Sequence, residues 1–195
     1  DGYPQRARTR ICSGASCRTG ILVTLARSEC SVTQHPIPAR FEIERKFLVT
    51  TLPDLTHSRK SHLQQGYIAT GETEVRLRAA DERYTLTCKK GNGISRREEE
   101  IELTLAHFET LWPLTEDCRI EKTRYTIPFR DYLIELDEYL GTLSPLLLAE
   151  IEFESEAASQ RIRLPDYFGK EVTDDPRYKN KRLALEGFPQ RSLTR

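Results

Sequence analysis

Charged residues recur at every second position in six separate stretches of this chain. Because successive side chains of a β-strand point to opposite faces, each set projects from one face of a strand. Three sets are acidic, two are basic, and one carries both signs. If these faces converge, they form one cavity for divalent cations and a polyanion together. The sets are Glu42, Glu44 and Lys46; Arg76 and Arg78; Glu98, Glu100 and Glu102; Lys122 and Arg124; Glu135 and Asp137; Glu150, Glu152 and Glu154.

Apolar residues fill the intervening positions, and two architectures satisfy such a pattern. A sandwich would bury the apolar faces and leave the charges in water, as half-solvated antiparallel strands do. A closed barrel would point the charges inward and cover its apolar outer face with helices. The periodicity by itself leaves both open. The intervening residues are Ile43, Val75, Leu77, Ile101, Leu103, Tyr125, Ile134, Leu136, Ile151 and Phe153.

Eight strands and few helices are expected, which predicts a mainly β member of the α+β class, either an antiparallel barrel or a sandwich. Thr104 and Ser155 are predicted to cap short helices, and Asp175-Pro176 is predicted to start a last helix that runs to about Leu185. Asn92-Gly93 favours a tight hairpin turn. The predicted strands span residues 41–49, 63–69, 74–79, 83–90, 98–105, 119–128, 132–140 and 146–153.

The first 39 residues differ in composition from the rest of the chain. They contain five Arg and only two acidic residues, and they are rich in Ser, Gly, Thr and Pro. We expect residues 1–39 to be a disordered or non-native N-terminal extension and residues 40–190 to form one domain. A signal peptide, a transit peptide and sequence translated upstream of the true start stay open as alternatives.

The overall charge and cysteine content narrow the class of protein. Lys and Arg number 30, as do Asp and Glu, so bulk electrostatic binding of nucleic acid is not expected. Apolar runs are too short to span a membrane, so no membrane partner is expected. The five cysteines are odd in number and irregularly spaced, which favours reduced thiols in a cytoplasmic protein.

The stretch from Phe41 to Phe47 reads Phe-Glu-Ile-Glu-Arg-Lys-Phe and resembles the Glu-x-Glu-x-Lys first strand of the CYTH superfamily, the triphosphate tunnel metalloenzymes. Further segments follow in the family's order over residues 40–186, and the chain is most similar to the small bacterial inorganic triphosphatases. The resemblance implies a closed eight-stranded antiparallel β-barrel tunnel with a charged lumen and helices packed outside. The segments are Gln65-Gly66-Tyr67, Val75 to Arg78, Lys89, Gly93 to Glu98, Ile120 to Tyr125, Ile134 to Asp137, Ala149 to Phe153 and Arg177 to Lys181.

The same resemblance implies a divalent cation, Mg²⁺ or Mn²⁺, and a linear triphosphate inside the tunnel. Carboxylates suit the cation because Mg²⁺ prefers hard oxygen ligands. The implied metal ligands are Glu42, Glu44, Glu150 and Glu152. The expected substrate-binding residues are Lys46, Arg76, Arg78, Lys89, Arg96, Lys122, Arg124, Lys179 and Lys181.

Two residues are candidates for activating the attacking water. Glu42 would act through a water on the metal, and Tyr67 would act as a base if surrounding cations lowered its pKa from about 10. A packed barrel tyrosine is the structural alternative for Tyr67. Lys46 is expected to protonate the leaving phosphate. Ion pairs that orient the basic residues are expected from Glu98, Glu100, Glu135 and Asp137.

The predicted function is divalent-metal-dependent hydrolysis of inorganic triphosphate to diphosphate and phosphate by a monomer or homodimer. A class IV-type adenylate cyclase, which converts ATP to cyclic AMP, and a thiamine triphosphatase are the alternatives within the same fold. Cyclisation needs a pocket for adenine and ribose, and the sequence shows no feature that supplies one. A polyphosphate-binding module is the non-enzymatic alternative, and it would not need the acidic metal set.

Overall fold

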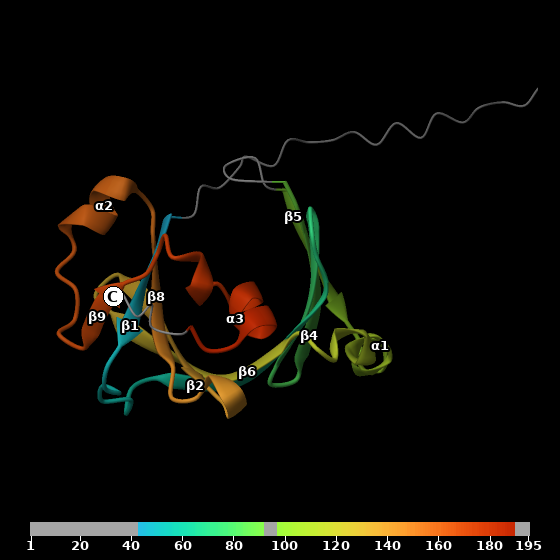
Figure 1. Ribbon diagram of the computed structural model, residues 1–195. Helices are drawn as coiled ribbons and strands as arrows, with labels where there is room; N and C mark the ends of the chain where they lie inside the picture. Colours follow the sequence, from blue (N-terminus) through green and yellow to red (C-terminus); the bar gives the residue numbers. More distant parts are fainter. Residues whose placement is uncertain (1–42, 92–96, 190–195) are drawn as a thin grey trace, which may run out of the picture. The chain divides into compact units, whose positions relative to one another are not determined.

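The computed structural model describes residues 43–91 and 97–189 (Figure 1). Contacts divide the chain into two units, Asp1–Pro38 and Ala39–Arg195, and the described residues all belong to the second. The predicted extension at residues 1–39 and the predicted turn at Asn92-Gly93 lie outside the described residues. The strands are β1 (Ile43–Val49), β2 (Arg59–Thr70), β3 (Thr73–Ala80), β4 (Arg83–Lys90), β5 (Arg97–Leu103), β6 (Arg119–Phe129), β7 (Tyr132–Tyr139), β8 (Leu147–Phe153) and β9 (Phe168–Glu171). The helices are α1 (Leu105–Leu111), α2 (Glu156–Arg161) and α3 (Asn180–Glu186), with short 3-10 turns η2 (Trp112–Thr115), η3 (Gly141–Leu143) and η4 (Pro176–Tyr178).

The strands form one antiparallel sheet in the order β5-β4-β3-β2-β6-β7-β8-β1-β9. This confirms the mainly β antiparallel fold. Figure 1 shows that the sheet curves strongly, so it has a concave and a convex face. The described sheet is not the expected closed barrel of eight strands. It has nine strands and ends in two edges, at β5 and β9. A barrel would need its end strands to pair.

Strand β9 is a strand that the sequence pattern did not predict. It has only four residues, Phe168 to Glu171, and includes a glycine, so it shows no alternation to detect. It pairs with β1, where Phe47 lies opposite Glu171. The pairing gives β1 a neighbour on both sides, because β8 lies along its other edge.

Apolar side chains of β1, β7 and β8 cover the convex face of one arm of the sheet. Ala158, Ile162 and Phe168 pack against them from α2, the segment after it and β9. The outer apolar face is therefore covered from outside, as a barrel-like arrangement predicts and a sandwich does not. The buried residues of this cluster are Phe47, Val49, Ile134, Leu136, Ala149, Ile151 and Phe153.

Helix α1 covers the convex face of the other arm, beside β3 and β4. Thr104 caps it as predicted, because its side chain accepts a hydrogen bond from the backbone N–H of His107 at 3.2 Å. Phe108 is buried with Leu77, and its ring stacks on Trp112 with centroids 4.9 Å apart. These contacts fix the direction in which the charged faces of β3 and β4 point.

Helix α3 lies on the concave side of the sheet (Figure 1). Leu183 packs there with Ile120, Tyr139 and Leu148, and the hydroxyl of Tyr139 donates a hydrogen bond to Asn180 Oδ1 at 2.5 Å. The expectation that all helices pack outside is therefore wrong for this element. The apolar face of α3 needs apolar partners, and Ile120 of β6, Tyr139 of β7 and Leu148 of β8 supply them.

The last helix is also shorter than predicted. Asp175 is an N-cap, as expected, but it caps η4 through the backbone N–H of Arg177. Lys179 then has extended backbone angles, φ −74° and ψ 134°, which separate η4 from α3. No helix among the described residues has both the length and the apolar character needed to cross a membrane.

Candidate active site

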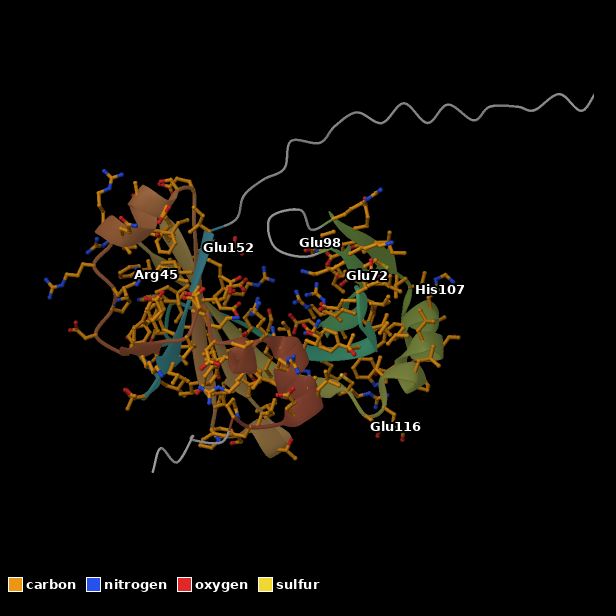
Figure 2. The ribbon with its side chains drawn as sticks, turned by 45° about the horizontal axis from the view of Figure 1, so that its top comes forward. Arg45, Glu72, Glu98, His107, Glu116 and Glu152 are labelled. Carbon is orange, nitrogen blue, oxygen red and sulfur yellow. The ribbon has the colours of Figure 1, made fainter. Side chains whose placement is uncertain are left out.

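Carboxylates and a lysine from β1 and β8 meet on the concave face. Glu44 lies opposite Glu152 in the strand register, and Lys46 lies opposite Glu150. The ammonium nitrogen of Lys46 is 2.6 Å from Glu150 Oε1 and 3.4 Å from Glu44 Oε1. In Figure 2 the side chain of Glu152 lies on the inner side of this arm of the sheet, and that of Glu98 lies on the inner side of the other arm. The charges of the two arms thus face a common space.

The predicted metal ligands are only partly assembled. Partial burial, and then the nearby charge of Glu150, raise the pKa of Glu44. No three His, Cys, Asp or Glu side chains within residues 43–91 and 97–189 are grouped closely enough to hold a metal. Glu42, the fourth predicted ligand, lies outside the described residues. The residues present nevertheless fit a hard cation, because their donors are carboxylate oxygens and the ammonium of Lys46 already lies between two of them.

A buried ion-pair cluster on β6 and β7 forms the middle of the concave face. Arg124 donates from Nε and Nη2 to the two oxygens of Asp137, both at 2.7 Å, and from Nη1 to Glu135. Its Nη2 also lies 3.7 Å from Glu150. Lys122 contacts Asp137 and, like it, has no exposed surface. Lys122 thus supports the carboxylate that holds Arg124, and its contact with substrate stays a prediction.

The electrostatics of Asp137 follow from these contacts. Burial alone would raise the pKa of its carboxyl group, but the attraction of Lys122 and Arg124 outweighs burial and lowers the pKa to about 2. Asp137 is therefore ionised at neutral pH. It fixes the guanidinium of Arg124 in one orientation, which is the role that the sequence predicted for it.

Two arginines of β3 carry positive charge that the described residues compensate only in part, because Arg76 has one long ion pair, to Glu100, and none is described for Arg78. Arg76 is buried and donates from Nη2 to the hydroxyl of Thr87 at 2.8 Å, with Glu100 farther away at 3.5 Å. Its Nε is buried, with no hydrogen-bond partner among the described residues. Arg78 donates from Nε and Nη2 to Gln65 Oε1 at 3.2 and 3.1 Å.

The environment of Arg78 confirms the excess of positive charge. No ion pair to Arg78 is seen in the described part of the chain, and its only hydrogen-bond partner there is the neutral side chain of Gln65. Burial, and then repulsion by Arg76 and Arg124, lower the pKa of Arg78 to about 10. The charge of an anionic ligand would offset this lowering of the pKa, and its oxygens could also accept a hydrogen bond from the unpaired donor of Arg76.

Tyr67 lies beside these arginines and is opposite Arg76 in the register of β2 and β3. Its hydroxyl accepts a hydrogen bond from Gln65 Nε2 at 2.6 Å. Burial, and then the charge of Glu74, raise the pKa of Tyr67 far above its usual value, against the opposing effect of Arg76 and Arg78. The nearby arginines do lower this pKa, but the loss of hydration outweighs them, and the catalytic role of Tyr67 stays a prediction.

Tyr67 lines an open cavity of about 490 Å³ on the concave face. Lys89 reaches it from β4 and pairs with Glu98 at 2.6 Å, as predicted. Lys181 reaches it from α3 and lies 3.1 Å from Glu74. The predicted residue Arg96 lies outside the described residues. The cavity is lined by Glu44, Lys46, Tyr67, Gly71, Glu72, Glu74, Lys89, Gly91, Val172, Thr173, Asp175, Lys179, Asn180 and Lys181.

Gln65 and Thr87 are site residues that the sequence reasoning missed. Both are fully buried on the concave face, and each holds one of the β3 arginines. The alternation of β2 was a usable signal for Gln65, since it places this residue on the same face as Tyr67. For Thr87 the residues gave no such signal, because threonine is an ordinary strand residue.

Comparison with known proteins gives a consistent result. The CYTH domain matches residues 40–178. An inorganic triphosphatase of Nitrosomonas europaea is 51% identical over 147 residues, which cover 74% of this chain and 97% of that protein. An inorganic triphosphatase of Acetivibrio thermocellus is 39% identical over 150 residues, or 75% of this chain and 95% of that protein. A crystal structure of an inorganic triphosphatase aligns with a TM-score of 0.63 at 49% identity, over 74% of this chain and 95% of that one.

Proposed function

This chain belongs to the CYTH domain family, and from that premise we propose that it is a metal-dependent hydrolase that cleaves inorganic triphosphate to diphosphate and phosphate. The observation that carries the proposal is a pair of inward-facing arginines of one strand: Arg78 has no ion pair among the described residues, and the buried Nε of Arg76 has no hydrogen-bond partner there. A linear triphosphate supplies several anionic oxygens in a row, which matches donors spaced along the concave face. The relatives named above support the same substrate.

The other cations of the site are held in place by carboxylates. Lys46, Lys89 and Arg124 each pair with an acidic residue on the concave face. Such pairs fix the positions of the cations before the substrate arrives, so little reorganisation is needed when phosphate oxygens approach. Phosphoryl transfer depends mainly on positioning and on neutralising charge, which this arrangement provides.

A divalent cation, Mg²⁺ or Mn²⁺, would be held by Glu44, Glu150 and Glu152, with Glu42 as the remaining predicted ligand. When bound, such an ion neutralises charge on the transferred phosphoryl group and polarises its oxygens. The carboxylates would hold the ion in position, and Lys46 beside them is placed to give a proton to the departing diphosphate. Glu42 stays the predicted residue for holding the attacking water.

The role proposed here for Tyr67 is that of a hydrogen-bond donor and not that of the base considered from the sequence. Its raised pKa keeps the phenol protonated at neutral pH, so it serves as a hydrogen-bond donor to a phosphoryl oxygen. A base at this position would need the opposite shift.

The closed tunnel implied by the resemblance belongs to this proposal too. The predicted metal ligands Glu44, Glu150 and Glu152 lie on the β1–β8 arm, and Arg76, Arg78 and Lys89 lie on the β3–β4 arm, so a metal-bound triphosphate that contacts both would join the two arms. A cytoplasmic location and a monomeric or dimeric state stay predictions from the sequence.

A substrate panel tests the proposed function. Phosphate release is measured with triphosphate, ATP, thiamine triphosphate and diphosphate in the presence of Mg²⁺, and again after chelation by EDTA. We expect rapid release from triphosphate, loss of release with EDTA, and recovery when Mg²⁺ or Mn²⁺ is restored. Cyclic AMP formed from ATP without free phosphate would favour the cyclase. Binding of triphosphate without turnover under all conditions would favour the polyphosphate-binding module.

A further inference from the structure

Gln65 bridges two residues of the site without reaching the cavity itself. Its side chain has no exposed surface and lies on the concave face of β2, opposite Arg78 in the register with β3. The carboxamide oxygen accepts both hydrogen bonds from Arg78, and the carboxamide nitrogen donates to the hydroxyl of Tyr67. One neutral side chain therefore contacts both a substrate-binding arginine and the tyrosine of the site.

The chemistry of the partners fixes the orientation of this amide. An arginine side chain has donors and no acceptor, so the oxygen of Gln65 has to face Arg78. The nitrogen then faces Tyr67, and the hydroxyl of Tyr67 must be the acceptor in that bond. A phenol carries one proton, and no other partner of this hydroxyl is seen among the described residues. The proton is thus left for an acceptor in the cavity that Tyr67 lines.

A carboxylate at the same position would have the opposite effect. Glutamate would hold Arg78 at least as firmly, but it has no donor and would accept the proton of Tyr67. The neutral amide is the side chain of this length that can accept from the arginine and donate to the tyrosine at once.

We propose that Gln65 is a positioning residue of the triphosphatase, which anchors Arg78 and directs the hydroxyl proton of Tyr67 toward a phosphoryl oxygen. The inference rests on the proposed function and adds to it the residue that orients the hydroxyl proton of Tyr67. Gln65 does not touch the substrate and acts through its two neighbours.

The kinetic test compares Gln65→Glu with the wild-type enzyme. We expect kcat for triphosphate to fall by about 100-fold, as when one preorganised donor is lost, while KM changes little because Arg78 stays anchored. Gln64→Glu is the matched control, since it adds the same charge at the next residue, on the opposite face of β2, and should leave kcat unchanged. Wild-type kcat in Gln65→Glu would overturn the proposal.

A double-mutant cycle separates this role from a merely structural one. In a Tyr67→Phe background the hydroxyl is gone, so adding Gln65→Glu should change kcat by less than about twofold if Gln65 acts through Tyr67. An equal loss in both backgrounds would overturn the proposal. Circular dichroism and urea unfolding check that each variant folds.

A spectroscopic test needs neither turnover nor a variant of Gln65. The side-chain amide of Gln65 is observed by NMR in the wild-type protein and in Tyr67→Phe, and its NH₂ resonances should shift when their acceptor is removed. Unchanged resonances would show that Gln65 does not donate a hydrogen bond to Tyr67, and they would overturn the proposal. A wild-type enzyme that leaves triphosphate intact would overturn the proposed function, whereas an active wild type with unaffected Gln65→Glu kinetics would overturn only the role of Gln65.

Discussion

Lys46 and Glu150 face each other across the β1–β8 pair, with the ammonium nitrogen 2.6 Å from the carboxylate. Both side chains are mostly buried, with 12% and 13% of their surfaces exposed. The predicted proton donor and a predicted metal ligand are thus in direct contact, at the place where substrate and cation would meet. A contact of this kind ties the charge state of one residue to that of the other.

Glu150→Ala is expected to abolish triphosphate hydrolysis while the protein still folds. The change removes a predicted metal ligand and leaves Lys46 with Glu44 as its remaining partner. Steady-state phosphate release and circular dichroism check the two parts of the prediction. Glu154→Ala is the matched control, because Glu154 belongs to the same acidic series but lies exposed past the end of β8, and it should keep wild-type activity. Full activity in Glu150→Ala would show that the metal assignment is wrong.

Glu44→Gln should raise thermal stability at pH 8 although it abolishes activity. The pKa of Glu44 is raised in the folded protein, so the stability this group contributes is present below its unfolded pKa and is lost as the pH rises through the folded value. At pH 8 the ionised carboxylate of Glu44 therefore destabilises the fold, and the neutral side chain of glutamine removes this destabilisation. We expect a rise in Tm at pH 8 and a smaller change at pH 4, measured by thermal unfolding in EDTA. A larger gain at pH 4 than at pH 8 would contradict the assigned direction.

Asp137→Asn should destabilise the fold by roughly 3–5 kcal/mol, because it leaves the buried ammonium of Lys122 without its counter-ion. Urea unfolding at pH 7 measures the change. The pKa of Asp137 is lowered to about 2, so its contribution is present above the unfolded pKa of about 4 and is lost as the pH falls toward 2. The difference between the variant and the wild type should therefore shrink below pH 4.

Glu135→Gln is the control for Asp137. Glu135 also contacts Arg124, but its side chain is 40% exposed, so its loss should cost about 1 kcal/mol or less. Equal losses for the two variants would contradict the burial argument.

Gly66→Ala should destabilise the protein by about 1–3 kcal/mol through overpacking. A Cβ atom at this position would lie 2.6 Å from Cβ of Thr115, which is buried in η2 and held by hydrogen bonds to Trp112 and Arg119. Gly71→Ala is the control, since no atom lies within 4 Å of the added methyl group, and it should be close to neutral. Chemical denaturation of both variants decides the matter, and an unaffected Gly66→Ala would show that β2 and η2 pack less tightly than described.

Local features of the sequence were sufficient to predict most elements. The strand at residues 83–90 was predicted with the bounds that β4 has, and Thr104, Ser155 and Asp175 cap the elements that follow them. These features depend on a side-chain period or on a hydrogen bond to a backbone group two or three residues away. Both are set by neighbours along the chain, so they can be read without the fold.

The sequence by itself determined which residues share a face, and the family resemblance added that the charged face points inward. Only the tertiary structure decided that Lys122 is buried beneath Arg124, that α3 lies on the concave side, and that Gln65 joins Arg78 to Tyr67. It also decided the direction of the pKa shift of Tyr67, because burial raises the pKa more than the nearby arginines lower it. The physical reason is that burial and charge compensation are sums over side chains from distant strands, whereas residue spacing reports only the direction in which each side chain points.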